Sequence, residues 1–177
     1  MTRKILIFNL IVLLLVLTGC RADNMNNKFF WSDTKICHYF TEEFLNSVED
    51  GDNEAIKALF APNALSKVDD MEKAIMDLLE YYQGEHSDFY MEGPMTSLEK
   101  HDGHIRKQMD GTYDVSTDKG DYRIAIRYVH IDTLNPDNVG IWYVYIIKVE
   151  DDPNQEYAYW GDGKETPGIN IGLVWPE

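Results

Sequence analysis

A run of ten residues decides the fold: Tyr122-Arg123-Ile124-Ala125-Ile126-Arg127-Tyr128-Val129-His130-Ile131. β-Branched and aromatic residues of this kind are enriched in strands, where successive side chains point to opposite faces. One face therefore carries Tyr122, Ile124, Ile126, Tyr128 and His130, and the other carries Arg123, Ala125, Arg127, Val129 and Ile131. Because both faces are partly apolar, we expect helices to cover one of them and the C-terminal tail or a second subunit to cover the other.

Turn signals divide the chain around this run into further strands. Alternating patterns predict strands at 86–91, 96–100, 104–109, 113–117 and 139–149, and His101-Asp102-Gly103 forms a turn between two of them. Asp110-Gly111 is typical of a two-residue hairpin turn. The segment from Glu150 to Glu177 is rich in loop residues, but its aromatics are too dense for a free tail. We expect Tyr157, Tyr159 and Trp160 to dock on the body of the domain.

Three helices are predicted before the strands. From Asp33 to Val48, apolar residues recur at three- and four-residue spacing and make one stripe. A short helix follows from Asn53 to Phe60, and Pro62 is expected to end it. The third helix is predicted from Val68 to Tyr82. Helices first and an antiparallel sheet afterwards predict one α+β domain, with three N-terminal helices against one sheet face.

The N-terminus has the features of a secretory signal. Thr2-Arg3-Lys4 is positive, and the apolar run from Ile5 to Leu17 is short for a membrane-spanning helix, which needs about 20 residues. Leu17-Thr18-Gly19-Cys20 follows and resembles the lipobox of bacterial lipoproteins. The resemblance implies removal of residues 1–19 and a diacylglyceryl group on Cys20. An uncleaved membrane helix is the alternative, which the polar residues after Cys20 disfavour.

This leader predicts the location and organisation of the mature protein. Residues 20–30 are expected to be the lipidated cysteine and a flexible tether, and residues 31–177 a single α+β domain. Each buried methylene contributes about 0.8 kcal/mol, and two acyl chains suffice for stable anchoring. We therefore expect the domain to be held at the cell membrane through Cys20, on the extracytoplasmic face.

Composition limits the partners. The net charge is −15, and because the leader carries Arg3 and Lys4 but no acid, its removal leaves −17. A surface this acidic repels nucleic acid and attracts cations, basic peptides or a basic protein. The charge also fits a simple role in solubility. Cys37 lies in an apolar helical pattern and is expected to be a small buried hydrophobe.

Three stretches of the domain carry a resemblance to a known family. They are Gly51-Asp52 leading to Leu59-Phe60, Thr117 to Arg123, and Pro136 to Ile141. Together they resemble a lipoprotein family of low-GC Gram-positive bacteria, domain of unknown function 5104. The order of helices and long strands also resembles the nuclear-transport-factor-two-like, or cystatin-like, cone. That resemblance implies a strongly curved sheet and a cleft between the sheet and the helices.

The cleft of such a cone is the first candidate for a binding site. Apolar walls with a few polar groups suit a small molecule or peptide. A filled core without a cavity is the alternative. The candidate ligand-binding residues are Phe40, Phe44, Tyr82, Tyr128, His130, Trp142 and Tyr145.

Other chemistry-bearing residues are few. His130 could act as a general base oriented by Asp132, although a partly buried histidine near a strand end is the simpler interpretation. His101 and His104 flank a turn and have no third ligand spaced with them, so we expect no metal site. The sequence contains no phosphate loop, dinucleotide fingerprint, serine elbow or metalloprotease helix, and no cofactor is expected.

Three functions therefore stay open. The leading hypothesis is a non-enzymatic module that binds a small molecule or peptide at the cell surface. The second is an acidic lipoprotein that interacts with a protein, for example a neutraliser of a basic toxin. The third is a small cone-fold enzyme that uses His130. Cone-fold domains often pair through the outer sheet face, so a homodimer is open as well.

Overall fold

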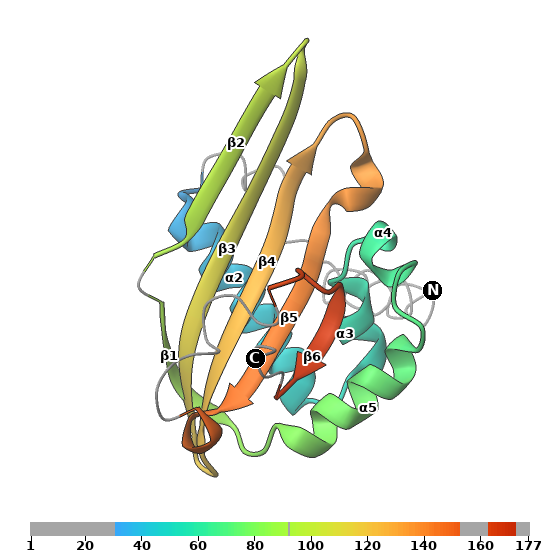
Figure 1. Cartoon of the computed structure of the whole chain (residues 1–177). Helices are drawn as coiled ribbons and strands as arrows, with labels where there is room; N and C mark the ends of the chain where they lie inside the picture. Colours follow the sequence, from blue (N-terminus) through green and yellow to red (C-terminus); the bar gives the residue numbers. More distant parts are fainter. Residues whose placement is uncertain (1–30, 92, 153–162, 173–177) are drawn as a thin grey trace, which may run out of the picture. The chain divides into compact units, whose positions relative to one another are not determined.

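A curled mixed sheet of six strands and four α-helices make up the part of the chain that the structure describes (Figure 1). This computed structural model describes residues 31–91, 93–152 and 163–172. The predicted leader, Cys20, the tether and the aromatic residues Tyr157, Tyr159 and Trp160 lie outside these ranges. The compact domain that contains the helices and the sheet begins at Asp33. Its helices precede its sheet in sequence, which confirms the predicted α+β class.

The helices number four rather than three, and Pro62 accounts for the difference. Helix α2 (Asp33–Glu49) buries its apolar stripe, α3 spans Asn53–Ala58, α4 spans Pro62–Leu65 and α5 spans Met71–Tyr81. Proline was expected to end a helix here, but it begins α4 at the first helical position. Proline suits that position because its fixed φ fits a helix and its missing N–H has no partner there anyway.

The strands are β1 (His86–Met91), β2 (Met95–His101), β3 (His104–Thr117), β4 (Asp121–Asp132), β5 (Gly140–Lys148) and β6 (Gly168–Ile171). Their order is β1-β3-β4-β5-β6, and β2 also pairs with β3. All pairs are antiparallel except β5 and β6, so the predicted purely antiparallel sheet is wrong at this edge. Parallel neighbours need a crossover of about a dozen residues or more, which the chain between Lys148 and Gly168 supplies.

Strand β3 runs straight through Asp110-Gly111, where a hairpin turn was predicted. Asp110 instead accepts a hydrogen bond from Arg127 Nε at 2.5 Å and one from the Tyr143 hydroxyl at 3.1 Å. Gly111 leaves room for Tyr113, since a Cβ at this position would lie 2.5 Å from the Tyr113 Oη. Within the strand, Asp110 therefore forms a part-buried ion pair with Arg127, and Gly111 allows close packing of Tyr113.

The two faces of β4 are covered as expected. Helix α2 lies behind the sheet in Figure 1, and its Phe40 ring stacks on Tyr128 at a centroid distance of 3.8 Å. On the outer face, Arg123 pairs with Asp114 and with the buried Asp152. Residues of the C-terminal segment also cover this face.

The C-terminal segment contacts the outer face through polar groups. Arg127 Nη1 lies 2.6 Å from Glu165 Oε2, and the Tyr145 hydroxyl accepts a hydrogen bond of 2.7 Å from the Thr166 N–H. These contacts confirm the expected cover from the tail. Both arginines of this face, Arg123 and Arg127, are paired with acids.

Cys37 is buried in helix α2, and burial raises the pKa of its thiol to about 12. Such a thiol stays protonated at neutral pH and behaves as a small hydrophobe, as expected. Within the ranges that the structure describes, no helix is long and apolar enough to cross a membrane.

Candidate functional site

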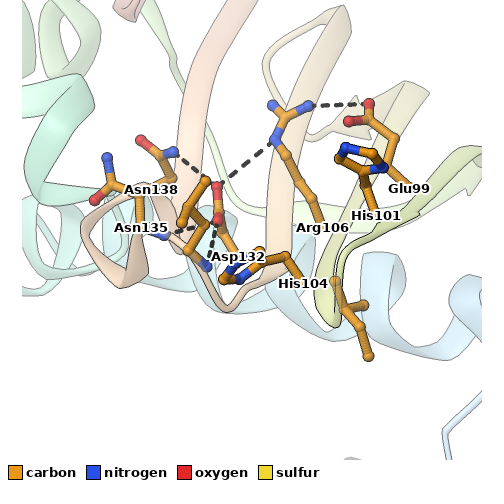
Figure 2. Close-up of a pocket in the computed structure, with 9 residues that line it drawn as sticks. Glu99, His101, His104, Arg106, Asp132, Asn135 and Asn138 are labelled. Atoms are coloured by element: carbon orange, nitrogen blue, oxygen red, sulfur yellow. Dashed lines mark hydrogen bonds and ion pairs between the residues drawn. The ribbon is translucent and has the colours of Figure 1, made fainter.

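A polar cleft lies where the β2–β3 hairpin meets the turn after β4 (Figure 2). Its volume is about 470 Å³, which falls in the usual range for small-molecule sites. The hairpin contributes one wall and the loop around the 3₁₀ helix η2 (Pro136–Asn138) contributes the other. The lining residues are Glu99, His101, His104, Ile105, Arg106, Asp132, Leu134, Asn135 and Asn138.

The register of the hairpin gathers the charged residues of the first wall. His101 is directly opposite His104, and Glu99 is directly opposite Arg106. Directly opposed residues, and residues two apart on one strand, share a sheet face. The turn between the strands is Asp102-Gly103, with φ of 48° and 82°. Positive φ at both central residues is typical of a type I′ turn, which fixes this register.

Asp132 organises the second wall. Its Oδ1 accepts hydrogen bonds from the backbone N–H groups of Leu134 (3.2 Å) and Asn135 (2.9 Å), and its Oδ2 accepts one of 2.8 Å from Asn138 Nδ2. Burial alone would raise the pKa of this carboxyl, but these hydrogen bonds outweigh burial and hold it below the ordinary value. The loop is therefore built around a buried carboxylate.

Helix α4 braces this second wall from behind. Asn138 accepts a hydrogen bond of 2.8 Å from Asn63 Nδ2 through its Oδ1. Since the amide of Asn138 also donates to Asp132, both ends of the side chain are fixed. Asn138 thus presents a rigid surface to the cleft rather than an adjustable side chain.

Arg106 spans the cleft between the two walls, as Figure 2 shows. Its Nη1 lies 3.5 Å from Glu99 Oε1 and its Nε lies 3.8 Å from Asp132 Oδ2. Both distances exceed the 2.7–2.9 Å, roughly, of a strong charge-assisted hydrogen bond. A guanidinium has five N–H donors, so Arg106 can bind an incoming anionic group without breaking a strong bond.

A smaller chamber of about 140 Å³ continues from this cleft across the outer sheet face. It shares Arg106 and Asn138 with the cleft and adds Arg127, Trp142 and Glu165, with Val129 completing its lining. Glu165 binds Arg127 here and has a φ of 57°, which is uncommon for a residue with a Cβ. The linings of the two chambers together include two arginines, Trp142 and Asn138.

Arg106 supplies a guanidinium to the cleft, beside the carboxylates of Glu99 and Asp132. Across the described parts of the chain, no group of three or more histidine, cysteine, aspartate or glutamate side chains could hold a metal ion. His101 and His104 share the cleft, and His101 is close to Asp102 at 3.1 Å on the exposed side. Arg106 with two asparagines offers donors that match a carboxylate or phosphate.

The structure does not gather the predicted ligand-binding residues into one site. Phe44, Tyr82 and Tyr128 are buried, and Phe40 stacks on Tyr128 beneath helix α2. The Tyr82 hydroxyl donates a hydrogen bond of 2.9 Å to Glu49. Phe44, Tyr82 and Tyr128 thus belong to the core between helices and sheet, and the half-buried Phe40 packs at its margin.

Trp142 and Tyr145 lie on the opposite, outer face of the sheet. They pack with Tyr143 and Ala125, and Lys67 Nζ lies 4.6 Å from the centre of the Trp142 ring. Of the predicted ligand-binding residues, Trp142 alone lines one of the two chambers described above.

His130 sits beside Tyr128, with ring centroids 6.1 Å apart. The β3–β4 register shifts at this point, so that Gln108 is opposite Val129 and Lys107 is opposite Ile131. Asp132, the acid that could have oriented His130, directs its carboxylate to the loop at Asn135 and Asn138 instead. His130 and Asp132 therefore do not form the expected base-and-orienter pair.

Sequence reasoning missed Glu99, Arg106, Asn135 and Asn138 as site residues. A partial signal for two of them was present, because the predicted hairpin brings Glu99 close to Arg106. A turn at 101–103 would place Glu99 opposite Ile105, and the observed two-residue turn at Asp102-Gly103 pairs it with Arg106 instead. The approach of the hairpin to the η2 loop had no such signal. It depends on the pairing register of β3 and β4, which includes a bulge at His130.

The fold and the cleft define a small α+β domain with a polar cleft at one end of its sheet. The chain belongs to the family described as Domain of unknown function (DUF5104), whose model matches residues 43–149. The match runs from within α2 to the end of β5 and includes every residue that lines the larger cleft. No curated protein matches the chain.

Proposed function

We propose that this protein is an extracytoplasmic lipoprotein whose domain binds a small molecule or peptide end that carries a carboxylate or phosphate group. The polar cleft at the end of the sheet is the binding site, and Arg106 is its anion-binding residue. The loose engagement of Arg106 is the observation that carries the proposal, since its nearest carboxylate oxygens lie 3.5 and 3.8 Å away. The acyl chains on Cys20 hold the domain at the membrane.

The surroundings of Arg106 support this assignment. Asp132 already accepts three hydrogen bonds from its loop, and its Oδ2 lies 3.8 Å from Arg106 Nε, too far for a strong hydrogen bond to the guanidinium. Glu99 is exposed and joins Arg106 over a long contact. An exposed ion pair of this kind contributes about 0–1 kcal/mol, whereas a hydrogen bond to a charged group contributes about 1.5–3 kcal/mol. A ligand carboxylate can therefore displace Glu99.

We also propose a fold family for the domain. We assign the domain to the nuclear-transport-factor-two-like cone, in which long curled strands wrap around a helix. The long strands β3, β4 and β5 and the position of α2 behind them support the assignment. The parallel strand β6 and the projecting β2–β3 hairpin are departures from a simple cone.

Binding can be tested with simple anions as probes. Citrate, succinate and inorganic phosphate would be titrated into the full chain, and binding followed by isothermal titration calorimetry and by the cleft amide signals in NMR spectra. Arg106→Gln should weaken binding at least about 10-fold, the effect expected for a lost charge-assisted hydrogen bond.

Lys100→Gln is the matched control for that experiment. It removes the same charge from the same hairpin, but Lys100 does not line the cleft. Its binding constant should stay within about 2-fold of the wild type, the size of a screened surface effect. Equal losses in the two variants, or no binding of any probe, would remove Arg106 from this role.

The anchor has its own test. Mass spectrometry of the chain purified from bacterial membranes should find an N-terminal cysteine with acyl chains and no residue before Cys20. Cys20→Ser should move the protein out of the membrane fraction. An intact Met1 without fatty acid would contradict the lipoprotein assignment and leave the binding test unaffected.

A further inference from the structure

Strand β2 has one edge that no other described strand pairs with. Its seven residues from Met95 to His101 are all exposed, and the hairpin that it forms with β3 projects at one end of the sheet (Figure 1). One edge of β2 pairs with β3, and no strand among the described residues pairs with the other. An exposed strand edge is a template for another strand, so proteins commonly blunt or cover it.

The register of the hairpin shows which backbone groups point outward. In a two-residue hairpin the flanking residues, here His101 and His104, are a hydrogen-bonded pair. The backbone of His104 therefore faces β2, and that of Ile105 faces away, which agrees with the hydrogen bond of 2.9 Å from Thr133 N–H to Ile105 O. By alternation, the N–H and C=O groups of Thr96, Leu98 and Lys100 face the open edge.

We propose that β2 is a homodimerisation edge, on which a second copy of this chain pairs antiparallel with its own β2. A two-fold axis perpendicular to the sheet keeps the side chains of both copies on the same sheet face. A residue at the axis must therefore pair with the same residue of the second copy. The three outward residues are centred on Leu98. Pairing of Leu98 with Leu98 and of Thr96 with Lys100 forms about six backbone hydrogen bonds, two for each hydrogen-bonded pair.

The side chains of β2 are compatible with this pairing. Leu98 is 52% exposed in the monomer and would be covered by the partner subunit's Leu98. Glu99 and Lys100 give the strand no net charge in a chain that otherwise has a surplus of acids. Two copies can thus approach at β2 with less repulsion than elsewhere on this surface.

Charge complementarity across the axis favours a second copy over another strand. The carboxylate of Asp33 forms an ion pair with Lys107, and Lys107 and the nearby Thr96 hydroxyl lower its pKa. In the proposed register, the partner subunit's Lys100 is directly opposite Thr96, and its side chain can reach this carboxylate. The two-fold axis produces the same contact twice.

The expected dimer is weak in dilute solution. A single strand edge buries much less than the roughly 800 Å² per subunit of a standard stable interface. Confinement of two copies on one membrane raises their effective concentration, so the dimer would form chiefly there. The interface is separate from the outer sheet face, where the C-terminal residues Glu165 and Thr166 already contact the sheet.

Cysteine cross-linking tests the register directly. In a hydrogen-bonded antiparallel pair the Cα atoms lie about 5.5 Å apart, within the range of about 4.4–6.8 Å that a disulfide spans. The full chain with Leu98→Cys, expressed in a bacterium, should form a disulfide-linked dimer in membranes under mild oxidation. The wild-type chain controls for cross-linking through Cys20, and Cys37 is buried.

Two further variants fix the register. Thr96→Cys and Lys100→Cys should each fail to cross-link alone, because each lies about 14 Å from its own copy at roughly 3.4 Å per residue. Co-expressed, they should cross-link with one another. Absence of the Leu98→Cys dimer, or equal cross-linking of all three single variants, would overturn the proposal. A test in membranes and one with the soluble Cys20→Ser form at high concentration separate a failed interface from a failed anchor.

Discussion

At the residue scale, Asp132 links the candidate site to the loop that forms its second wall. The side chain closes the loop after β4 by accepting hydrogen bonds from two backbone N–H groups and from Asn138. The same carboxylate lies 3.8 Å from Arg106 and thereby sets the distance between the two walls of the cleft. One buried acid thus connects the stability of the fold to the geometry of the site.

We expect Asp132→Asn to lower the free energy of unfolding by about 1–3 kcal/mol at about pH 7. The folded-state pKa of Asp132 lies below the ordinary value of 3.8, so the carboxylate form stabilises the folded protein. This contribution is fully present above the unfolded-state pKa and is lost as the pH falls through the folded-state value. The difference from wild type should therefore shrink below about pH 4.

Urea denaturation between about pH 7 and pH 2.5 measures this difference. Asp137→Asn is the control, because Asp137 is an exposed residue in the same loop. Its effect should stay within about 0.5 kcal/mol at every pH. A difference for Asp132→Asn that is constant with pH would assign the loss to packing instead of charge.

At the element scale, the link between α3 and α4 docks on the start of β5. The Ala61 N–H donates to Ile141 O and the Ile141 N–H donates to Leu59 O, both at 2.9 Å. Gly140 permits this approach, since its φ is 130° and a Cβ there would lie 2.6 Å from the Ala61 nitrogen. Two of the stretches that suggested the family, Leu59-Phe60 and Pro136 to Ile141, meet at this contact.

Gly140→Ala should therefore lower the free energy of unfolding by about 2–4 kcal/mol, since it combines backbone strain with a clash against main-chain atoms. Thermal and urea denaturation both measure the loss. Gly120→Ala provides the comparison, because Gly120 has no atom within 4 Å of the added carbon and no positive φ. If both variants unfold at the same urea concentration, the close approach of β5 to Ala61 does not limit stability.

Sequence patterns predicted the elements better than their connections. Periodicity located α2, α5 and most strands, because burial of one face leaves a repeat in the chain. Asp110-Gly111 was wrongly predicted to be a turn because turn propensity is a local signal, whereas the hydrogen-bond partners of Asp110 in the strand, Arg127 and Tyr143, are distant in sequence. The parallel strand β6 left little local signal in its four residues.

The candidate site was less predictable for the same reason. Aromatic residues were expected to line a cleft. Burial of their large apolar surfaces is favourable, however, and Phe44, Tyr82 and Tyr128 are buried in the core. The polar cleft depends on a hairpin and a loop that β3–β4 pairing brings together. No short pattern in a single sequence indicates that this hairpin and this loop lie close together.

At the scale of the whole molecule, acidic residues outnumber basic ones by 31 to 16. Several basic residues are already paired, among them Arg123 and Arg127 beneath the C-terminal segment and Lys107 at Asp33. The remaining acids repel one another in the folded state more than in the expanded unfolded chain. Salt screens this repulsion, with a Debye length that falls from about 30 Å at 0.01 M to about 8 Å at 0.15 M.

The melting temperature should consequently rise by several degrees between about 10 and 300 mM sodium chloride, the shift that about 1 kcal/mol produces in a domain of this size. Exposed pairs such as Lys57–Glu72 and Lys73–Asp77 lose part of their attraction in salt, but water already screens them, so their contribution to stability is small. Potassium chloride at equal ionic strength should give the same shift, because screening depends on ionic strength rather than on the ion. A melting temperature that falls with salt in both would mean that attractive pairs outweigh the surplus of acids, and the acidic surface would then be a net source of stability.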